Sequence, residues 1–143
     1  MIEIKSFKIR KKKFVLKGSS IKLPNIGLVT ISGPVGTGKS SFIKALYRGK
    51  IKVKGIRHNK FIKSCSYVAP AFNIVDGYTG NDYINRYKKY GRIDEEVLNN
   101  LFIELNIEHL RKSVLSSCSD GEKTRFFLCL GLSLNAQIVL IDE

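Results

Sequence analysis

Long hydrophobic runs are missing from this 143-residue chain, and cysteine is scarce. No apolar run approaches the roughly 18–20 residues that span a membrane, and the N-terminus lacks the apolar stretch of a signal peptide. The three cysteines, Cys65, Cys118 and Cys129, are odd in number and have no metal-binding spacing. We therefore expect a soluble, intracellular chain whose cysteines serve as small hydrophobic residues, and any membrane association must come through a partner.

Acidic residues are also scarce: 12 Asp and Glu stand against 25 Lys and Arg, which gives a formal net charge of +13. One interpretation is a surface for nucleic acid or an anionic membrane. The other is the codon usage of an A+T-rich genome, because Lys greatly outnumbers Arg. Basic residues occur along the whole chain, and only 10–13 form a tight run without interleaved aromatic residues. We favour codon usage, so nucleic acid is not an expected partner.

The octapeptide at residues 33–40 fits the pattern G-x-x-x-x-G-K-[ST], which is typical of a phosphate-binding loop. Its glycines let the backbone wrap a phosphate chain, Lys39 supplies a positive charge for the outer phosphates, and the Ser40 hydroxyl is placed to ligate Mg²⁺. The predicted ATP-binding residues here are Gly33, Pro34, Val35, Gly36, Thr37, Gly38, Lys39, Ser40 and Ser41.

The flanks of this loop support the assignment. Residues 28–32 are apolar and β-branched, which predicts a buried strand, and residues 41–47 predict a helix closed by Gly49. A strand, a glycine-rich turn and a helix in this order aim the helix N-terminus at the phosphates. The sequence therefore predicts that the chain binds a nucleoside triphosphate.

The rest of the chain predicts one α/β domain without internal repeats. Short alternating segments predict a small antiparallel sheet before the loop and strands after it, and a change of period predicts helices later in the chain. The expected strand segments are 2–9, 14–16, 21–23, 50–55, 64–68 and 137–141, and the expected helices are 81–90, 94–105 and 120–134. The last helix is apolar nearly all round, so we expect it to be buried.

Two further motifs carry chemistry. Asp142 and Glu143 follow an apolar strand, where Asp142 would hold the Mg²⁺ shell and Glu143 would act as the catalytic base that polarises the attacking water, with Lys39 as the other catalytic residue. The alternative is an acidic strand end that caps a helix. Ser119 and Glu122 form a capping-box pattern, and the same Ser-x-Gly helix start, with Gly121, could also contact a γ-phosphate from another subunit.

These motifs together resemble the nucleotide-binding domain of ABC ATPases, whose LSGGQ hallmark appears here in the altered form Cys118–Glu122. The resemblance implies a P-loop NTPase fold with a RecA-like parallel sheet, an antiparallel β subdomain and a helical subdomain at 71–118, all within one domain at 1–143. It also implies Mg²⁺ and ATP as cofactors and a head-to-tail dimer in which Ser119 and Gly121 meet the partner's nucleotide. A transmembrane permease would hold the domain at the cytoplasmic face of a membrane. Residues 49–79 resemble the multidrug-resistance-type exporter branch.

The chain also departs from this family. Pro70 occupies the expected position of the Q-loop glutamine, and the adenine-stacking aromatic is uncertain between Phe7 and Phe14. The sequence stops at Glu143, before the family's D-loop and switch histidine, and His58 and His109 come too early to substitute. We expect a C-terminally incomplete domain that alone hydrolyses ATP slowly or not at all. The alternatives are a nucleic-acid-associated ABC ATPase and a non-hydrolysing, truncated nucleotide-binding remnant.

Overall fold

The structure is a computed structural model that describes residues 2–11, 14–54, 58–69, 74–89 and 93–142. Two compact units are present: residues 1–65 together with Asp142, and residues 66–141 together with Glu143. Each unit is described by itself below. Glu143 and Pro70 lie outside the described residues, so the roles predicted for them stay predictions.

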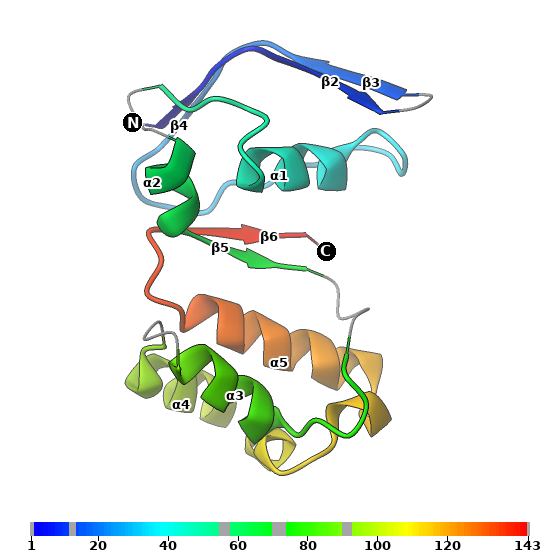
Figure 1. Cartoon of the computed structure of the whole chain (residues 1–143), viewed down its shortest axis with the longest axis vertical. Helices are drawn as coiled ribbons and strands as arrows, with labels where there is room; N and C mark the ends of the chain where they lie inside the picture. Colours follow the sequence, from blue (N-terminus) through cyan, green and yellow to red (C-terminus); the bar gives the residue numbers. More distant parts are fainter. Residues whose placement is uncertain (1, 12–13, 55–57, 70–73, 90–92, 143) are drawn as a thin grey trace. The chain divides into compact units, whose positions relative to one another are not determined.

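The first unit begins with two antiparallel strand pairs (Figure 1). Strand β1 (Ile2–Ile4) pairs with β4 (Ile21–Leu23), and β2 (Phe7–Lys11) pairs with β3 (Phe14–Gly18). The antiparallel sheet expected before the loop is therefore confirmed, although Lys5 and Ser6 interrupt the first strand. The strand expected at 50–55 is reduced to a single bridge between Ile4 and Val53.

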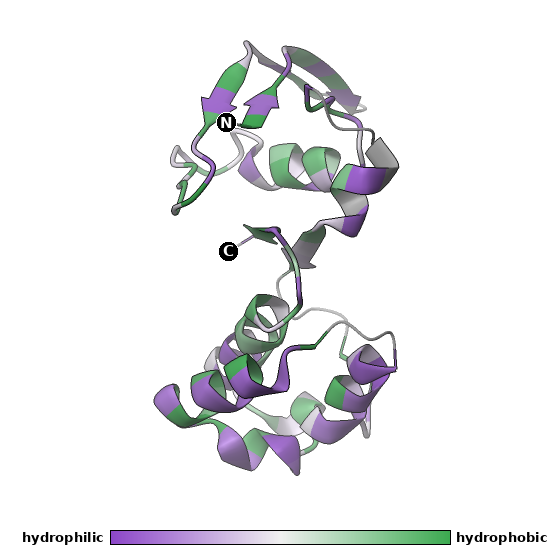
Figure 2. Ribbon diagram, turned by 90° about the vertical axis from the view of Figure 1, so that its left-hand side faces the viewer, coloured by the Kyte–Doolittle hydropathy of each residue, from purple (hydrophilic) through white to green (hydrophobic). Residues whose placement is uncertain are grey.

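Hydrophilic and hydrophobic residues alternate along these strands (Figure 2), which places most of their apolar side chains on one side of each strand pair. Ile4 and Ile9 are buried, and the Phe7 ring lies 5.2 Å from the Phe42 ring of helix α1 (Lys39–Tyr47). Ala45 and Leu46 of α1 are buried as well. The same unit contains the short helix α2 (His58–Lys63).

The buried strand predicted at 28–32 is wrong. None of these residues is in a strand, and Leu28, Val29 and Ile31 are exposed, Leu28 by 87%. A strand requires a neighbour that accepts and donates its backbone hydrogen bonds, and nothing in the described part of the chain pairs with this segment. Its β-branched composition is thus not sufficient to make it a strand here.

The second unit holds three α-helices, two short 3₁₀ helices and a pair of strands. Their bounds are α3 (Gly80–Lys88), α4 (Glu95–Glu104), η1 (Glu108–Arg111), η2 (Leu115–Ser117), α5 (Asp120–Leu132), β5 (Cys65–Val68) and β6 (Ile138–Ile141). The strands β5 and β6 are neighbours in one sheet, and their arrows run in the same direction in Figure 1. The three α-helices and the two strands agree with the sequence expectations to within a few residues, whereas neither 3₁₀ helix was predicted.

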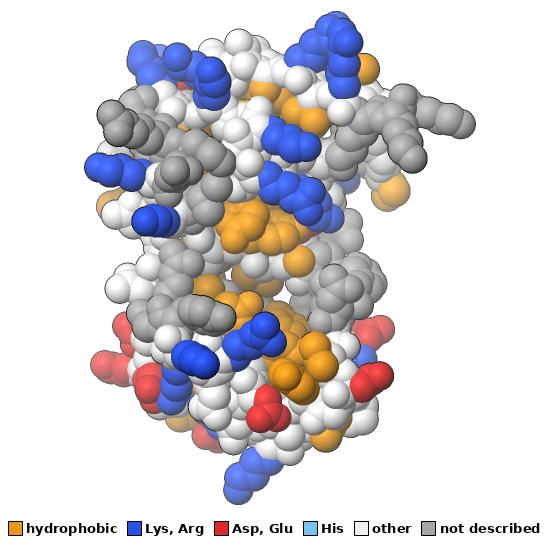
Figure 3. Space-filling model, viewed as in Figure 1, with side chains coloured by type: hydrophobic (Ala, Val, Ile, Leu, Met, Phe, Trp, Pro, Cys, Tyr) orange, Lys and Arg blue, Asp and Glu red, His pale blue; other side chains and the backbone are white. Residues whose placement is uncertain are grey.

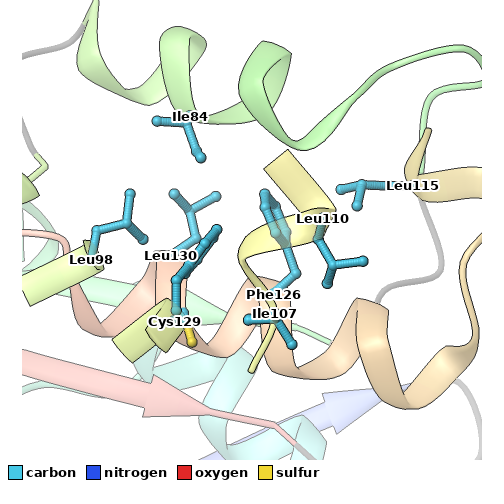
Figure 4. Packing of buried hydrophobic residues seen from close by; sticks show 9 residues of the cluster. Ile84, Leu98, Ile107, Leu110, Leu115, Phe126, Cys129 and Leu130 are labelled. Atoms are coloured by element: carbon cyan, nitrogen blue, oxygen red, sulfur yellow. The ribbon is translucent and has the colours of Figure 1, made fainter. Parts of the chain in front are cut away.

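One apolar cluster holds the helices of this unit together (Figure 4). Phe102 of α4 and Phe126 of α5 are fully buried with ring centroids 5.6 Å apart, and the Tyr83 ring of α3 lies 6.3 Å from Phe126. The buried members are Ile84, Leu98, Phe102, Ile107, Leu110, Leu115, Phe126, Cys129 and Leu130. They come from α3, α4, α5 and both 3₁₀ helices or the segments beside them, so the helical part of the chain has its own core.

The burial predicted for the last helix is only partly correct. Phe126, Cys129 and Leu130 of α5 are buried, whereas Leu132 is 39% exposed. On β5, Ser66 donates a hydrogen bond of 3.0 Å to the carbonyl of Gly131, which ties this strand to α5. Cys65 and Cys129 are buried, as expected of small hydrophobic residues, and burial raises the pKa of both to about 11, whereas Cys118 is only partly buried.

Candidate nucleotide-binding site

The loop at 33–40 owes its path to glycine. Gly36 and Gly38 have φ angles of 85° and 101°, which residues with a side chain adopt at a cost. Gly38 ends the loop in the left-handed region, and α1 begins at the next residue. The backbone therefore turns within a few residues from an irregular segment into a helix, which is the geometry of a phosphate-binding loop.

Lys39 folds back over this loop. Its Nζ donates hydrogen bonds of 2.8 Å to the carbonyl of Gly33 and 3.0 Å to the carbonyl of Pro34. The Thr37 hydroxyl donates to the same Pro34 carbonyl at 2.9 Å. The ammonium group thus lies beside the loop backbone, where it can reach a phosphate chain by exchanging two neutral carbonyls for charged oxygens.

The N-terminus of α1 differs from those of the three other long helices. Helices α3, α4 and α5 are capped by the side chains of Thr79, Asp94 and Ser119, and each has acidic residues in its first turn. Helix α1 has Gly38 at the cap, no side-chain cap and no acidic residue in its first turn. The partial positive charge at this helix start is therefore not offset by a side-chain cap or by a carboxylate of its own first turn, which favours an anion there.

Asp142 is brought to the same helix. Its carboxylate, which is only 3% exposed, lies 3.1 Å from the Nζ of Lys44. Lys44 stands four residues after Ser40, so the two residues share one face of α1. The arrangement places the predicted metal-binding carboxylate against the helix that carries the predicted metal-binding hydroxyl. Sequence reasoning missed Lys44, which its i+4 spacing from Ser40 could have indicated.

The oxygen donors of this region suit Mg²⁺. A serine hydroxyl and a carboxylate are hard oxygen ligands, and Mg²⁺ is bound in proteins by one or two such groups together with phosphate oxygens and water. Within the described residues, no group of three or more His, Cys, Asp or Glu side chains could hold a metal by itself. The donor set therefore fits a metal that arrives with a nucleotide.

The structure distinguishes the two aromatic candidates for adenine stacking. Phe7 packs against Phe42 beneath the sheet. A Cβ on Gly38 would meet the Phe14 ring at 2.8 Å, so Phe14 borders the phosphate loop. Of the two, only Phe14 lies at the loop.

Ser119 and Gly121 lie in the second unit, at the start of α5. The predicted capping box is present: Ser119 Oγ accepts a hydrogen bond from the Glu122 N–H at 3.3 Å, and the Ser119 N–H donates to Glu122 Oε2 at 2.9 Å. The Ser119 hydroxyl itself donates to the same oxygen at 2.8 Å. Sequence reasoning missed His109, whose Nε2 lies 3.0 Å from the other Glu122 oxygen.

Comparison with known proteins agrees with these motifs. The profile of the ABC transporter family matches residues 16–143. The chain belongs to this family. It is 28% identical to the phosphate import ATP-binding protein PstB of Saccharolobus solfataricus over 92% of the chain and 61% of that protein. It is 26% identical to the cytochrome c biogenesis ATP-binding export protein CcmA of Reclinomonas americana over 94% of the chain and 66% of that protein.

Solved structures show the fold of the family. An ABC transporter ATP-binding protein from Pyrococcus furiosus superposes with a TM-score of 0.82 at 21% identity, covering 99% of this chain and 74% of that one. An inward-facing metal-chelate type ABC transporter gives a TM-score of 0.75 at 18% identity, covering 99% of this chain and 60% of the other. The P-loop NTPase fold of ABC ATPases predicted from the sequence is thereby confirmed. The chain spans 36%, 61% and 59% of the length of three curated relatives.

Family membership identifies the chain as an ABC-type ATP-binding domain, as the motifs predicted. The relatives include import and export proteins, so the exporter branch inferred from residues 49–79 stays a prediction. None of the helices in the described segments is long and apolar enough to cross a membrane.

Proposed function

We propose that this chain binds Mg·ATP at the 33–40 loop and, with a second nucleotide-binding domain, hydrolyses it to drive transport through a transmembrane permease. The observation that carries the proposal is the uncapped, acid-free N-terminus of α1 with Lys39 folded over the loop before it. The other long helices of the described chain neutralise their N-termini with their own side chains. Helix α1 has neither such a cap nor such a carboxylate, so the partial positive charge at its start favours a phosphate chain.

In this proposal each residue of the first unit has a distinct role. The backbone of residues 33–38 surrounds the phosphates, Lys39 contacts the outer phosphates, and Ser41 completes the contacts at the helix start. Ser40 and Asp142 hold Mg²⁺, which supplies charge neutralisation at the phosphates when it is bound. In this structure Lys44 pairs with Oδ2 of Asp142, so Lys44 would compete with the metal for that oxygen.

Phe14 is the residue that we propose stacks on the adenine, because it borders Gly38 whereas Phe7 is used in packing. Glu143 is proposed as the base that polarises the attacking water. Ser119 and Gly121 are proposed to contact the nucleotide of the second domain in a head-to-tail dimer. Since the Ser119 hydroxyl is bonded to Glu122 in this structure, that contact requires the hydroxyl to exchange partners.

Calorimetric titration of Mg·ATP into the chain and into Lys39→Ala tests the proposal. Lys50→Ala is the matched control, because Lys50 is exposed and lies in the same unit outside the loop. We expect the wild-type chain and Lys50→Ala to bind with the same affinity and Lys39→Ala to show no measurable binding. Absence of binding by the folded wild-type chain would contradict the proposal. It would favour the alternative that the chain is a truncated remnant that no longer binds nucleotide.

A further inference from the structure

The basic residues of this chain are unevenly divided between its two units. Residues 1–65 hold 17 of the 25 Lys and Arg residues but only one of the 12 Asp and Glu residues, namely Glu3. On the face that Figure 3 shows, the charged side chains of the first unit are almost all Lys and Arg, and the Asp and Glu side chains lie mainly on the second unit. A codon bias acts on a whole gene, yet residues 1–65 contain 14 lysines and residues 66–143 contain four. Codon usage alone therefore does not explain the charge.

The strand pair β2–β3 directs its charges to one side. Ile9 is buried and its ladder partner Leu16 is half-buried, so these residues face the interior. Lys8, Arg10 and Lys17 alternate with them and are exposed. The outer side of this hairpin consequently carries three cations, and Val15 is the one apolar residue exposed among its described positions.

The second strand pair repeats this arrangement. Ile4 of β1 faces inward and bridges Val53, while the flanking Lys52 and Lys54 are exposed. Lys5 and Lys22 are exposed as well, and Glu3 is the one carboxylate, paired with Lys54 at 3.1 Å. The outward residues of both pairs define a basic face: Lys5, Lys8, Arg10, Lys17, Lys22, Lys52 and Lys54, with Glu3.

Lys8 and Lys17 indicate that this face has a partner. They stand directly opposite each other in the β2–β3 ladder, and no acidic residue occurs in either strand. Like charges in this position destabilise a sheet. Residues that oppose the stability of the fold in this way are expected where a ligand supplies the missing charge.

We propose that the basic face binds the phosphate backbone of double-stranded nucleic acid without regard to sequence. The proposal goes beyond ATP binding and transport, and it does not involve the phosphate loop. Charge complementarity to a polyphosphate is the first argument. The composition of the face is the second: it has no aromatic residue on which the bases of a single strand could stack and no Asn or Gln side chain that could read adenine.

The same composition argues against a lipid surface as the partner. Surface-bound membrane segments combine cations with apolar side chains that enter the acyl boundary. In the two strand pairs described above, the exposed apolar residues are Val15 and Ile21, at 49% and 39% exposure, against seven exposed cations on the basic face. A face so rich in cations and so poor in apolar side chains is suited to a partner that carries its charge on the outside, as a duplex does.

Fluorescence anisotropy of a labelled 20-base-pair DNA of arbitrary sequence tests the proposal, with the 143-residue chain titrated at several salt concentrations. The variant is Lys8→Gln/Arg10→Gln/Lys17→Gln. The matched control is Arg86→Gln/Lys89→Gln/Lys112→Gln, which removes the same residue types and the same net charge from exposed positions of the second unit. Circular dichroism confirms that both variants are folded.

We expect the wild-type chain and the control to bind with a steep dependence on salt. The variant should bind on the order of a hundredfold more weakly at about 0.15 M salt, and its log–log salt slope should be shallower by about 2.7, which is 0.9 for each lost phosphate contact. Excess Mg·ATP and Lys39→Ala should leave the affinity unchanged, which separates this face from the phosphate loop. A second duplex of different sequence should bind equally.

Two results would overturn the proposal. One is the absence of duplex binding at about 50 mM salt, or an equal loss in the variant and the control. The other is binding to phosphatidylserine vesicles, lost in the variant alone, without binding to duplex, which would assign the face to a membrane surface. Neither result bears on the calorimetric test of Mg·ATP binding, so the two proposals succeed or fail separately.

Discussion

Glu122 and His109 form a hydrogen-bonded pair at the start of α5, with His109 Nε2 lying 3.0 Å from Glu122 Oε1. The second carboxylate oxygen of Glu122 accepts hydrogen bonds from the N–H and the hydroxyl of Ser119. A residue of the altered LSGGQ motif is thereby fixed by a side chain from η1. Both contacts favour the ionised carboxylate, and together they give this helix start a dependence on pH.

The stability of the second unit should fall with acid through Glu122. The hydrogen bond from His109, followed by those from Ser119, lowers the pKa of Glu122 to about 2, below its ordinary value of about 4.3. A lowered pKa in the folded state contributes stability above the unfolded pKa, and this contribution is lost as the pH falls from about 4.5 to about 2.

Thermal unfolding of the wild-type chain and of Glu122→Gln between pH 2 and pH 6 measures this effect. The wild-type chain should be the more stable at pH 6, and the difference should vanish near pH 2. Thr79 lowers the pKa of Asp82 in the same direction, but this pair is present in both proteins and cancels in the difference. If the difference in stability between the two proteins stays constant from pH 2 to pH 6, the loss of stability in acid does not come from Glu122.

Gly38 and Gly121 should respond in opposite ways to alanine. Gly38 has a φ of 101°, and a Cβ there would meet Phe14 at 2.8 Å. Gly38→Ala should therefore destabilise the fold by about 1–3 kcal/mol and weaken Mg·ATP binding. Gly121 lies in the first turn of α5, and a Cβ would meet nothing within 4 Å, so Gly121→Ala should be neutral or stabilise by up to about 1 kcal/mol. Urea unfolding of both variants checks this pair, and equal destabilisation would refute it.

Lys17→Thr should separate stability from nucleic-acid binding. Removal of one member of the Lys8–Lys17 pair should stabilise the β2–β3 hairpin by about 0.2–1 kcal/mol and at the same time weaken duplex binding. Lys22→Thr removes an outward cation that stands opposite Glu3 in the β1–β4 ladder, so it should weaken duplex binding without stabilising the sheet. If Lys17→Thr lowers the unfolding midpoint, the pair does not cost stability.

The chain by itself should turn over ATP slowly or not at all. The proposed Ser119 contact is made to the nucleotide of a second domain, and in this structure the Ser119 hydroxyl is bonded to Glu122. Phosphate release measured at low and at high protein concentration checks this expectation. Fast turnover that is proportional to concentration would show that a single chain is catalytically complete.

The sequence predicted correctly those features whose structure depends on interactions between residues close together in the chain. The glycine-rich loop, the capping box of Ser119 and Glu122, and the helices 80–88 and 95–104 depend on neighbours a few residues away. The partners of those elements were not predictable in this way. The pairs Lys44–Asp142 and His109–Glu122 join residues far apart or on different elements, and no periodicity encodes them.

The incorrect prediction of a strand at 28–32 has the same cause, because a strand depends on partners elsewhere in the chain. Its composition satisfies the preference for a pleated, half-buried environment, but that environment is created by neighbouring strands and not by the segment itself. The basic face also could not be predicted from the sequence, because the outward direction of its cations follows from the registers of the β1–β4 and β2–β3 ladders.

The exposed segment 26–31 has a consequence for the chain in solution. Ile-Gly-Leu-Val-Thr-Ile is uncharged, rich in β-forming residues and free of proline, which is the composition that stacks between molecules in cross-β assemblies. Mutual repulsion between molecules of net charge +13 opposes such stacking at low ionic strength. Added salt screens this repulsion and leaves the apolar attraction in place, so colloidal solubility should decline as salt is raised.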